Sequence, residues 1–318
     1  MAERHEIMPS TRKERIGWYF YDFANSAFYT TVITVFLGPY LTTIAKNCAD
    51  ASGNIDVYGL QVFSGSFFAY LVSFSVLLQV VFLPVLGAIA DYSNREKLLM
   101  GIFAYIGAGA TSLLYFLDQG NYMLGGWLFV VANFSFGASV VMYNAFLADI
   151  ATPDQRDEVS SNGWAFGYLG GGIVLAANLF LFANADAFGI ETTHAVRISL
   201  CSAGLWWATF SVLPMLTLRN RRSSLSLSRG ENMLTVGFRK LAATARDARN
   251  HPQTLVFLLA YVFFDDGVQS VITISSQFGQ EELGLDLSTL TTVILMVQFV
   301  AFGGAILFKY ISKSIGNK

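Results

Sequence analysis

Charged side chains are scarce in this sequence, at 13% of its 318 residues, whereas hydrophobic residues make up 54%. A mean hydropathy of +0.50 is too high for a water-soluble chain of this length to hide in one core. The sequence therefore predicts a protein that uses membrane lipid as a second solvent. Nucleic acid is not expected as a partner, because the net charge is −2 and the acidic and basic residues nearly balance.

Residues that build metal and nucleophile sites are also few. The two cysteines, Cys48 and Cys201, fit no metal-ligand spacing, and a disulfide between them would draw a loop into a hydrophobic run. His5, His194 and His251 lie in or next to expected loops, without cysteine or histidine partners at ligand spacing. Phosphate-cradling loops and nucleophile constellations are absent from the sequence as well. We therefore expect neither an enzyme, nor a catalytic residue, nor a cofactor or metal site.

Long stretches without any charge divide the chain. Seven of them meet or exceed the roughly 20 residues that a spanning helix needs: 23–45, 57–90, 98–117, 119–148, 159–185, 198–218 and 287–308. An eighth stretch, 250–280, is uncharged except for Asp265 and Asp266. The runs are continuous rather than alternating, which favours helices over barrel strands. The sequence predicts an all-α polytopic membrane protein with about eight transmembrane helices.

Basic residues lie almost entirely on one side of these spans. If the N-terminus is cytoplasmic, all but two of the 20 Lys and Arg residues face the cytoplasm, and only Lys46 and Arg197 face outward. This is the positive-inside pattern. Residues 1–15 are charged and hold no apolar signal-peptide core, so we expect the first helix to be retained. The expected location is the plasma membrane of a bacterium, or a vacuolar or other endomembrane of a eukaryote.

The longest cytoplasmic segment, residues 218–250, is basic and rich in serine, and we interpret it as a linker. It separates a six-helix unit, residues 1–217, from two further helices in residues 251–318. Four apolar residues in the linker recur at the spacing of one helix face: Leu234, Phe238, Leu241 and Ala245. This spacing fits a short helix on the inner membrane surface, and a solvated loop is the alternative.

The first and seventh helices carry the same polar pattern. Residues 22–26 read Asp-x-x-Asn-Ser, and residues 266–270 read Asp-x-x-Gln-Ser. In each helix the polar residues share one face, which Tyr29 and Thr273 continue. Two such stripes, six spans apart, fit a duplication of six-helix halves, and chance is the rival explanation.

Carboxylates inside a membrane are costly and are by default functional or paired, and no Lys or Arg lies as deep in these helices. The candidate substrate or coupling residues are Asp22, Asn25, Ser26, Tyr29, Asp265, Asp266, Gln269 and Ser270. For Asp22, an interfacial residue near the helix end is an equal alternative. Asp266 shares its face with Gln269 and Ser270, so we expect it to exchange a proton during transport. Asp265, about 100° further around the helix, is expected to face a neighbouring helix.

Residues 87–97, between the second and third spans, read Gly-Ala-Ile-Ala-Asp-Tyr-Ser-Asn-Arg-Glu-Lys. This segment resembles the loop 2–3 signature of the major facilitator superfamily, G-x-x-x-D-x-x-G-R-x-K/R, with Asn94 in place of the second glycine. Its motif residues are Gly87, Asp91, Arg95 and Lys97. The glycine would let helices approach, the aspartate would accept from a helix N-terminus, and the two basic residues would anchor the inner loop. An ordinary polar loop is the alternative.

Two further segments, 18–28 and 144–172, look like the branch of this superfamily that includes the vacuolar amino-acid effluxers of autophagy. The resemblance implies secondary-active transport of a small solute by alternating access. The aspartates within the spans disfavour a purely anionic solute, so a cation, a zwitterion such as an amino acid, or a neutral solute with proton coupling is expected. A non-transporting membrane receptor or scaffold built on a transporter fold is the alternative.

The same resemblance implies twelve helices in two six-helix halves, of which this chain would hold eight. Residues 304–318 look like a degenerate second copy of the loop signature, with Lys313 where Asp91 stands in the first. We therefore expect an incomplete C-terminal half and a seventh and eighth helix that lack some of their neighbours.

The fifth span carries Gly163, Gly167 and Gly171 at four-residue spacing, which predicts close helix packing. This spacing is similar to the antiporter motif of the superfamily but lacks its proline, so antiport does not follow. Asn133 and Asn144 on the fourth span are expected to bond neighbouring helices.

Overall fold

The computed structural model describes residues 11–93, 95–118, 120–221 and 249–315, together with positions 239, 243, 246 and 247. Its first half contains α1 (Arg12–Ala27), η1 (Phe28–Phe36), α2 (Leu37–Asn47), β1 (Asn54–Val57), β2 (Leu60–Phe63), η2 (Ser64–Ser66), α3 (Phe67–Ser93), α4 (Glu96–Leu113) and η3 (Leu114–Phe116). Then follow α5 (Tyr122–Ile150), α6 (Arg156–Ala183), η4 (Asp186–Phe188), α7 (Thr192–Thr217), α9 (Pro252–Glu281) and α10 (Leu287–Ile315). The apolar face predicted in the linker lies outside the described residues.

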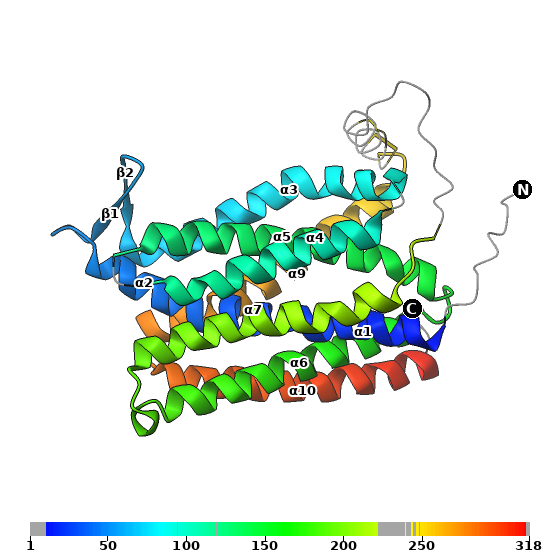
Figure 1. Ribbon diagram of the computed structural model, residues 1–318. Coiled ribbons are helices and arrows are strands. Elements are labelled where there is room, and N and C mark those ends of the chain that lie inside the picture. Colours follow the sequence, from blue (N-terminus) through cyan, green and yellow to red (C-terminus); the bar gives the residue numbers. More distant parts are fainter. Residues whose placement is uncertain are drawn as a thin grey trace, which may run out of the picture.

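Among the described residues, eight helical segments are long and apolar enough to cross a membrane. They confirm the predicted all-α fold with eight spans. The helices run side by side, with the start of α1 and the end of α10 at one end of the bundle and the β1–β2 hairpin at the other (Figure 1). The positive-inside pattern predicts that the end with the hairpin, called the outer end below, faces away from the cytoplasm.

The first span is longer than the charge pattern predicted, because α1, η1 and α2 form one continuous segment of 36 residues. Thr11 and Glu14 form a capping box, in which each side chain accepts a hydrogen bond from the other residue's backbone N–H group. Four charged residues thereby become the first turn of α1, and Asp22 lies about 15 Å along the helix from Arg12. Asp22 is therefore not next to a loop, and the choice between an interfacial and a functional role stays a prediction.

A π-helical segment, η1, occupies the middle of this span, which the sequence did not indicate. Two threonine hydroxyls lie against its backbone: Thr30 donates to the carbonyl oxygen of Ser26 at 2.8 Å, and Thr34 donates to that of Tyr29 at 3.0 Å. Wide helical turns of this kind are rare in proteins as a whole, and those that occur often lie at functional sites.

The hairpin at the outer end was also missed, because residues 57–66 continue the charge-free run of the second span. β1 and β2 pair antiparallel from Asn54 with Phe63 to Val57 with Leu60. The two residues between the strands, Tyr58 and Gly59, both have positive φ, at 55° and 85°, as the common two-residue hairpin turn requires. The second membrane span therefore begins near residue 64 rather than at 57.

Glycines of α6 let this helix approach α1 closely. A Cβ atom at Gly170 would lie 2.3 Å from the carbonyl oxygen of Phe23, and one at Gly163 would lie 2.5 Å from the ring of Trp18. At Gly171 the nearest atom would be Cγ2 of Thr30, at 2.8 Å. The tightest approach is thus at Gly170, which the four-residue spacing did not single out.

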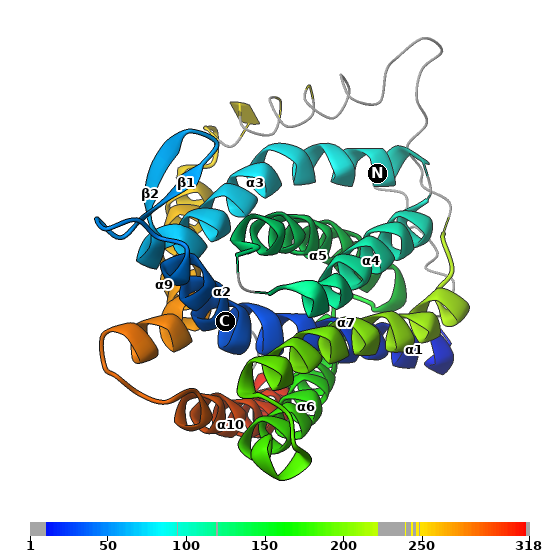
Figure 2. The ribbon, with the colours of Figure 1, turned by 60° about the vertical axis from the view of Figure 1, so that its left-hand side comes forward.

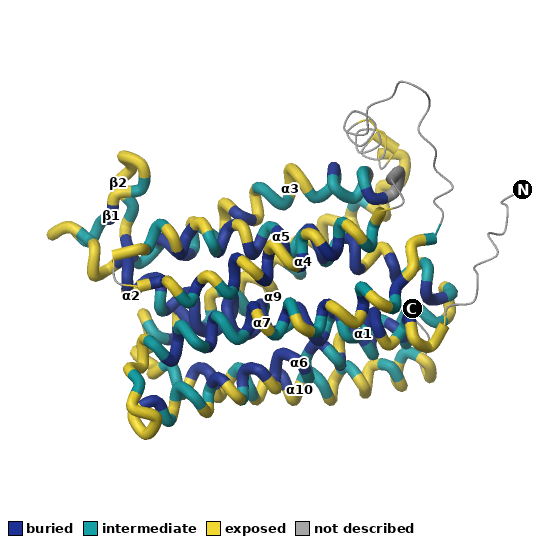
Figure 3. Tube along the Cα trace, in the orientation of Figure 1, coloured by how far each residue is buried: buried dark blue, intermediate teal, exposed yellow. Residues whose placement is uncertain are grey.

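The last two helices differ in how closely they pack against the rest of the bundle. α10 packs along α6, whereas α9 touches mainly η1, α2 and α10 (Figure 2). Buried residues concentrate along the first span, and most of α9 is exposed (Figure 3). Asn133 donates a 2.7 Å hydrogen bond to Ser75 of α3, as expected, but Asn144 is exposed.

Candidate functional site

Asp22 of α1 lies against a glycine of α6. A Cβ atom at Gly167 would come within 2.8 Å of both Asp22 Oδ2 and Ser26 Oγ, so the missing side chain leaves room for these two polar groups. Asp22 is half-buried, and within the described residues it has no hydrogen-bond or ion-pair partner. Its charge acts on the nearby hydroxyls of Tyr143 and Tyr168. A carboxylate without a partner in such a setting is open to a cationic group or a proton.

Several buried polar groups lie in this part of the bundle without a bonding partner among the described residues. They include the amide Nδ2 of Asn25, whose residue is 2% exposed, and the hydroxyls of Tyr21 and Tyr143. The Tyr143 ring is stacked on Trp18 with 4.3 Å between centroids, and the Trp18 indole donates to the Tyr143 carbonyl oxygen at 2.9 Å. Packing therefore fixes these side chains in place, while their polar ends stay available.

The π-helical segment is the part of the first span that contacts α9 through Tyr29. The hydroxyl of Tyr29 donates a 2.5 Å hydrogen bond to Oε1 of Gln269. The same hydroxyl interacts with the side chain of Thr273 and lies near the carboxylate of Asp265. The polar stripes of the two helices thus meet directly, and they bring together residues about 240 positions apart in the sequence.

The face of α9 that points to η1 differs from the expected one. Asp265 is half-buried beside Tyr29, while Asp266 and Ser270 are exposed. Gln269 belongs to two possible faces of a helix, one through positions 265 and 273 and one through 266 and 270. Contact with Tyr29 selects the first of them. Asp265 therefore lies on the side of α9 that contacts the first span, and the roles expected for Asp265 and Asp266 both stay predictions.

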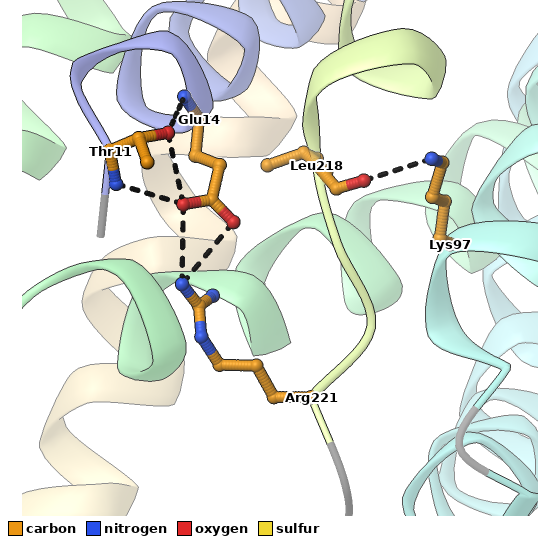
Figure 4. Close-up of polar contacts among 5 residues, drawn as sticks. All are labelled: Thr11, Glu14, Lys97, Leu218 and Arg221. Carbon is orange, nitrogen blue, oxygen red and sulfur yellow. Dashed lines mark hydrogen bonds and ion pairs between the residues drawn. The ribbon is translucent and has the colours of Figure 1, made fainter. Parts of the chain in front are cut away.

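Of the loop signature, Lys97 makes the best-defined contacts. Its ammonium donates to the carbonyl oxygen of Leu218 at 2.8 Å (Figure 4). Its backbone N–H donates to Oδ1 of Asn220 at 3.0 Å. Arg95 is the exposed N-cap of α4. Lys97 therefore ties the end of α7 to α4, a link that the sequence did not predict.

At Gly87, a Cβ atom would meet only Val141, at an ordinary 3.7 Å, so close helix approach does not explain this glycine. Asp91 lies in the last turn of α3, and Asn94 and the Asp91 side chain lie outside the described part of the structure. The predicted contact of Asp91 with a helix N-terminus stays a prediction.

A second tie at this end of the bundle joins α1 to the segment after α7. Arg221 forms an ion pair with Glu14, with 3.2 Å between Nη2 and Oε1 (Figure 4). Glu14 is 2% exposed. One carboxylate therefore caps α1 and holds the beginning of the linker.

At the outer end, α9 contacts the first span and the loop before α3. Gln277, which is 6% exposed, donates to the Thr42 hydroxyl at 3.1 Å and to the Gly65 carbonyl oxygen at 2.8 Å. One turn further, Lys46 forms an ion pair with Glu281. At the opposite end, Lys309 and Lys313 of α10 pair with Glu158 of α6 at 3.0 and 2.8 Å. Polar contacts therefore join α9 and α10 to the other helices at both membrane faces.

Comparison with known proteins identifies the family. Residues 10–318 match the family model described as "Vacuole effluxer Atg22 like". The chain belongs to this family. The relatives carry transporter or effluxer names rather than enzyme names, in agreement with the expectation that the chain is not an enzyme.

Individual relatives are distant in sequence. The chain is 28% identical to the "Uncharacterized MFS-type transporter YxiO" of Bacillus subtilis (strain 168), over 98% of this chain and 70% of that protein. It is 24% identical to the "Autophagy-related protein 22" of Gibberella zeae, over 99% of this chain and 61% of that protein. Matches of this kind cover nearly the whole chain but only part of each relative.

Among solved structures, the fold is similar to the xylose transporter XylE of E. coli. The partially occluded inward-open form matches with a TM-score of 0.59 at 15% identity, over 96% of this chain and 74% of that one. The inward-open form matches with a TM-score of 0.57 at 14% identity, over 95% and 68%. The protein is thus a multi-pass membrane protein with the helix arrangement of the major facilitator superfamily.

Proposed function

We propose that this protein moves a small zwitterionic or cationic solute across a membrane by alternating access, with proton coupling. The observation that carries the proposal is the meeting of the two polar stripes, where Tyr29 donates to Gln269 beside a half-buried Asp265, on the same helical segment as the half-buried Asp22. Asp265 lies near the hydroxyl of Tyr29, and Asp22 lies near those of Tyr143 and Tyr168. Such a site disfavours a purely anionic solute and offers acceptors to an ammonium group or a proton.

Roles follow from these positions. Asp22 would accept the cationic group or the proton, because no described Lys or Arg forms an ion pair with it. Asn25 and Ser26 would bond the polar part of the solute, and the Tyr29–Gln269 pair would open and reform as α9 moves. The outer contacts of Gln277 support a state closed to the outside, as does the likeness to inward-open structures.

Reconstituted protein tests the proposal. Proteoliposomes would be screened with radiolabelled amino acids and amines, with and without a pH gradient, using Asp22→Asn as the binding variant. The matched control is Asp186→Asn, because Asp186 is exposed in the loop after α6. We expect saturable flux that Asp22→Asn removes and Asp186→Asn retains. The absence of saturable flux for every solute in well-folded protein would favour the receptor or scaffold alternative.

Orientation has its own test. Cys48 is an exposed free thiol at the end of the bundle that is expected to face outward. An impermeant maleimide should label it in intact cells, in a Cys201→Ser background. A cysteine introduced at the exposed Arg219 should be protected until the membrane is opened. The reverse pattern would overturn the cytoplasmic N-terminus.

A further inference from the structure

A groove of about 530 Å³ lies on the outside of the bundle between α4 and α7. Its walls are Leu98, Gly101, Ile102, Tyr105 and Met215, with Lys97 and Asn220 at one end. This end coincides with the start of α4 and the end of α7, where the basic residues of the chain gather. The groove is therefore apolar along its length and polar at its cytoplasmic mouth.

The shape of the groove follows from the residues at the helix contact. At Gly101 a Cβ atom would come within 2.8 Å of the Met215 sulfur, so the glycine lets α7 approach and sets the floor. Leu98, Ile102 and Tyr105 stand beside it and are 53%, 44% and 44% exposed. On a spanning helix such side chains face lipid. From Lys97 to Tyr105 the groove extends about 12 Å along the helix axis, most of the roughly 15 Å depth of one leaflet.

Charge at the mouth favours an anion. Arg95, Lys97 and Arg219 lie within two residues of each other or of a lining position, against the single carboxylate of Glu96. Arg95 and Arg219 are exposed. The Lys97 ammonium uses one of its three N–H donors in a hydrogen bond to the Leu218 carbonyl oxygen, and this bond holds the ammonium at the mouth of the groove (Figure 4). The helix dipole of α4 adds positive potential at the same place.

We propose that this groove binds one anionic phospholipid of the inner leaflet. The lipid phosphate would lie between Lys97, Asn220 and Arg219, and an acyl chain would lie along Ile102 and Tyr105 over Gly101. Basic pockets between transmembrane helices on the cytoplasmic side have this ligand chemistry. Because the groove begins where Lys97 holds the end of α7, a bound lipid would brace the α4–α7 contact.

Lipid retention tests this site. The protein would be reconstituted into nanodiscs of dioleoylphosphatidylcholine with a minor share of dioleoylphosphatidylglycerol, extracted into mild detergent, and analysed by native mass spectrometry. We expect one phosphatidylglycerol to be retained in preference to phosphatidylcholine. Arg219→Gln should weaken this retention about fivefold, because one cation near a membrane surface contributes about that factor. The double variant Lys97→Gln/Arg219→Gln should weaken it further.

Two more variants separate the groove from general surface charge. Ile102→Trp fills the groove without changing any charge and should remove the retained lipid. Arg12→Gln/Lys13→Gln removes two exposed cations from the start of α1 at the same end of the bundle, and should leave retention unchanged. Every variant must first elute as a monodisperse peak, and Arg219→Gln alters only an exposed residue.

Three results would overturn the proposal. The first is equal retention of both lipids, and the second is full retention in Ile102→Trp. The third is displacement of the bound species by inorganic phosphate alone, which would indicate a site for a free anion rather than a lipid.

Discussion

The first span and α9 are both long apolar helices with a polar stripe, yet their surroundings differ. In the most apolar window of the first span 83% of the residues are buried, and in that of α9 none are. The first span lies against the glycines of α6, whereas the contacts of α9 with the first span include the polar side chains of Gln269 and Gln277. One stripe is therefore held rigidly, and the other is held by contacts that can break and reform.

The largest expected effect tests the rigid side of this comparison. Gly170→Ala places a methyl group 2.3 Å from the Phe23 carbonyl oxygen, and backbone cannot move aside cheaply. We expect a loss of about 3 kcal/mol or more in stability. The matched control in α9 is Gly267→Ala, where no atom lies within 4 Å of the new methyl. This control should be neutral or stabilise by up to about 1 kcal/mol.

Thermal unfolding followed by size-exclusion chromatography measures both glycine variants. If Gly170→Ala unfolds at the same temperature as the unaltered protein, α6 does not approach α1 as closely as described. If Gly267→Ala is the more damaging of the two, the comparison between the two helices is reversed.

The next effect distinguishes the two carboxylates of α9. Asp265→Asn should lower flux at least about tenfold, because it removes a carboxylate beside Tyr29, and ionisable groups inside a membrane typically act with energies of a few kcal/mol. Asp266→Asn, at an exposed position, should have a smaller effect. Proton-driven accumulation in proteoliposomes is the measurement. Loss of accumulation in Asp266→Asn alone would restore the original expectation from the sequence and would place Asp266 in the coupling site.

These two aspartates show what the sequence could and could not supply. The eight spans followed from the spacing of charges, because a missing charge over about 20 residues has one common explanation in a membrane. The stripes were also visible, since Asp22 and Gln269 interrupt otherwise apolar runs. Which side of α9 faces the first span was not visible, because both faces through Gln269 carry an aspartate.

Three local backbone features could not be predicted from the sequence, for a different reason. The π-helical segment around Tyr29 depends on contacts with α7, α6 and α9, and its residues read as an ordinary apolar helix. The hairpin is free of charges after Asp56, so it merged with the following span. The extension of α1 to Arg12 does not follow from the charge pattern, because the first turn of the helix is itself charged and the Thr11–Glu14 capping box marks its start.

A smaller effect concerns the contacts by which α9 is held at its outer end. Glu281→Lys breaks the half-exposed ion pair with Lys46, and such pairs contribute about 0.2–1 kcal/mol. The equilibrium should shift toward the outward-open state by up to about fivefold. Ser276→Cys is a suitable reporter, because Ser276 is 1% exposed and its hydroxyl has no partner among the described residues.

Maleimide labelling of this reporter, in a Cys48→Ser/Cys201→Ser background, should accelerate by the same factor in Glu281→Lys. The charge-swapped protein Lys46→Glu/Glu281→Lys should return to the original rate. A swap that labels as fast as the single variant would mean that the pair does not hold α9 closed.

The smallest expected effect concerns the carboxylates at the starts of α1 and α10. Glu14 caps α1 in a buried ion pair, whereas Asp286 caps α10 in the open, accepting from the Thr289 hydroxyl at 2.6 Å and from its backbone N–H at 2.9 Å. These bonds to Thr289 lower the pKa of the Asp286 carboxyl below its ordinary value. A group with a lowered folded-state pKa stabilises the protein above its unfolded pKa of about 3.9, and this contribution is lost as the pH falls through the folded-state pKa.

Asp286→Ala should therefore lower the unfolding temperature slightly at neutral pH, and the difference should shrink on acidification. Thr289→Ala, which keeps the backbone bond, should produce part of the same change. A difference of equal size at both pH values would mean that the carboxylate charge contributes nothing to the cap.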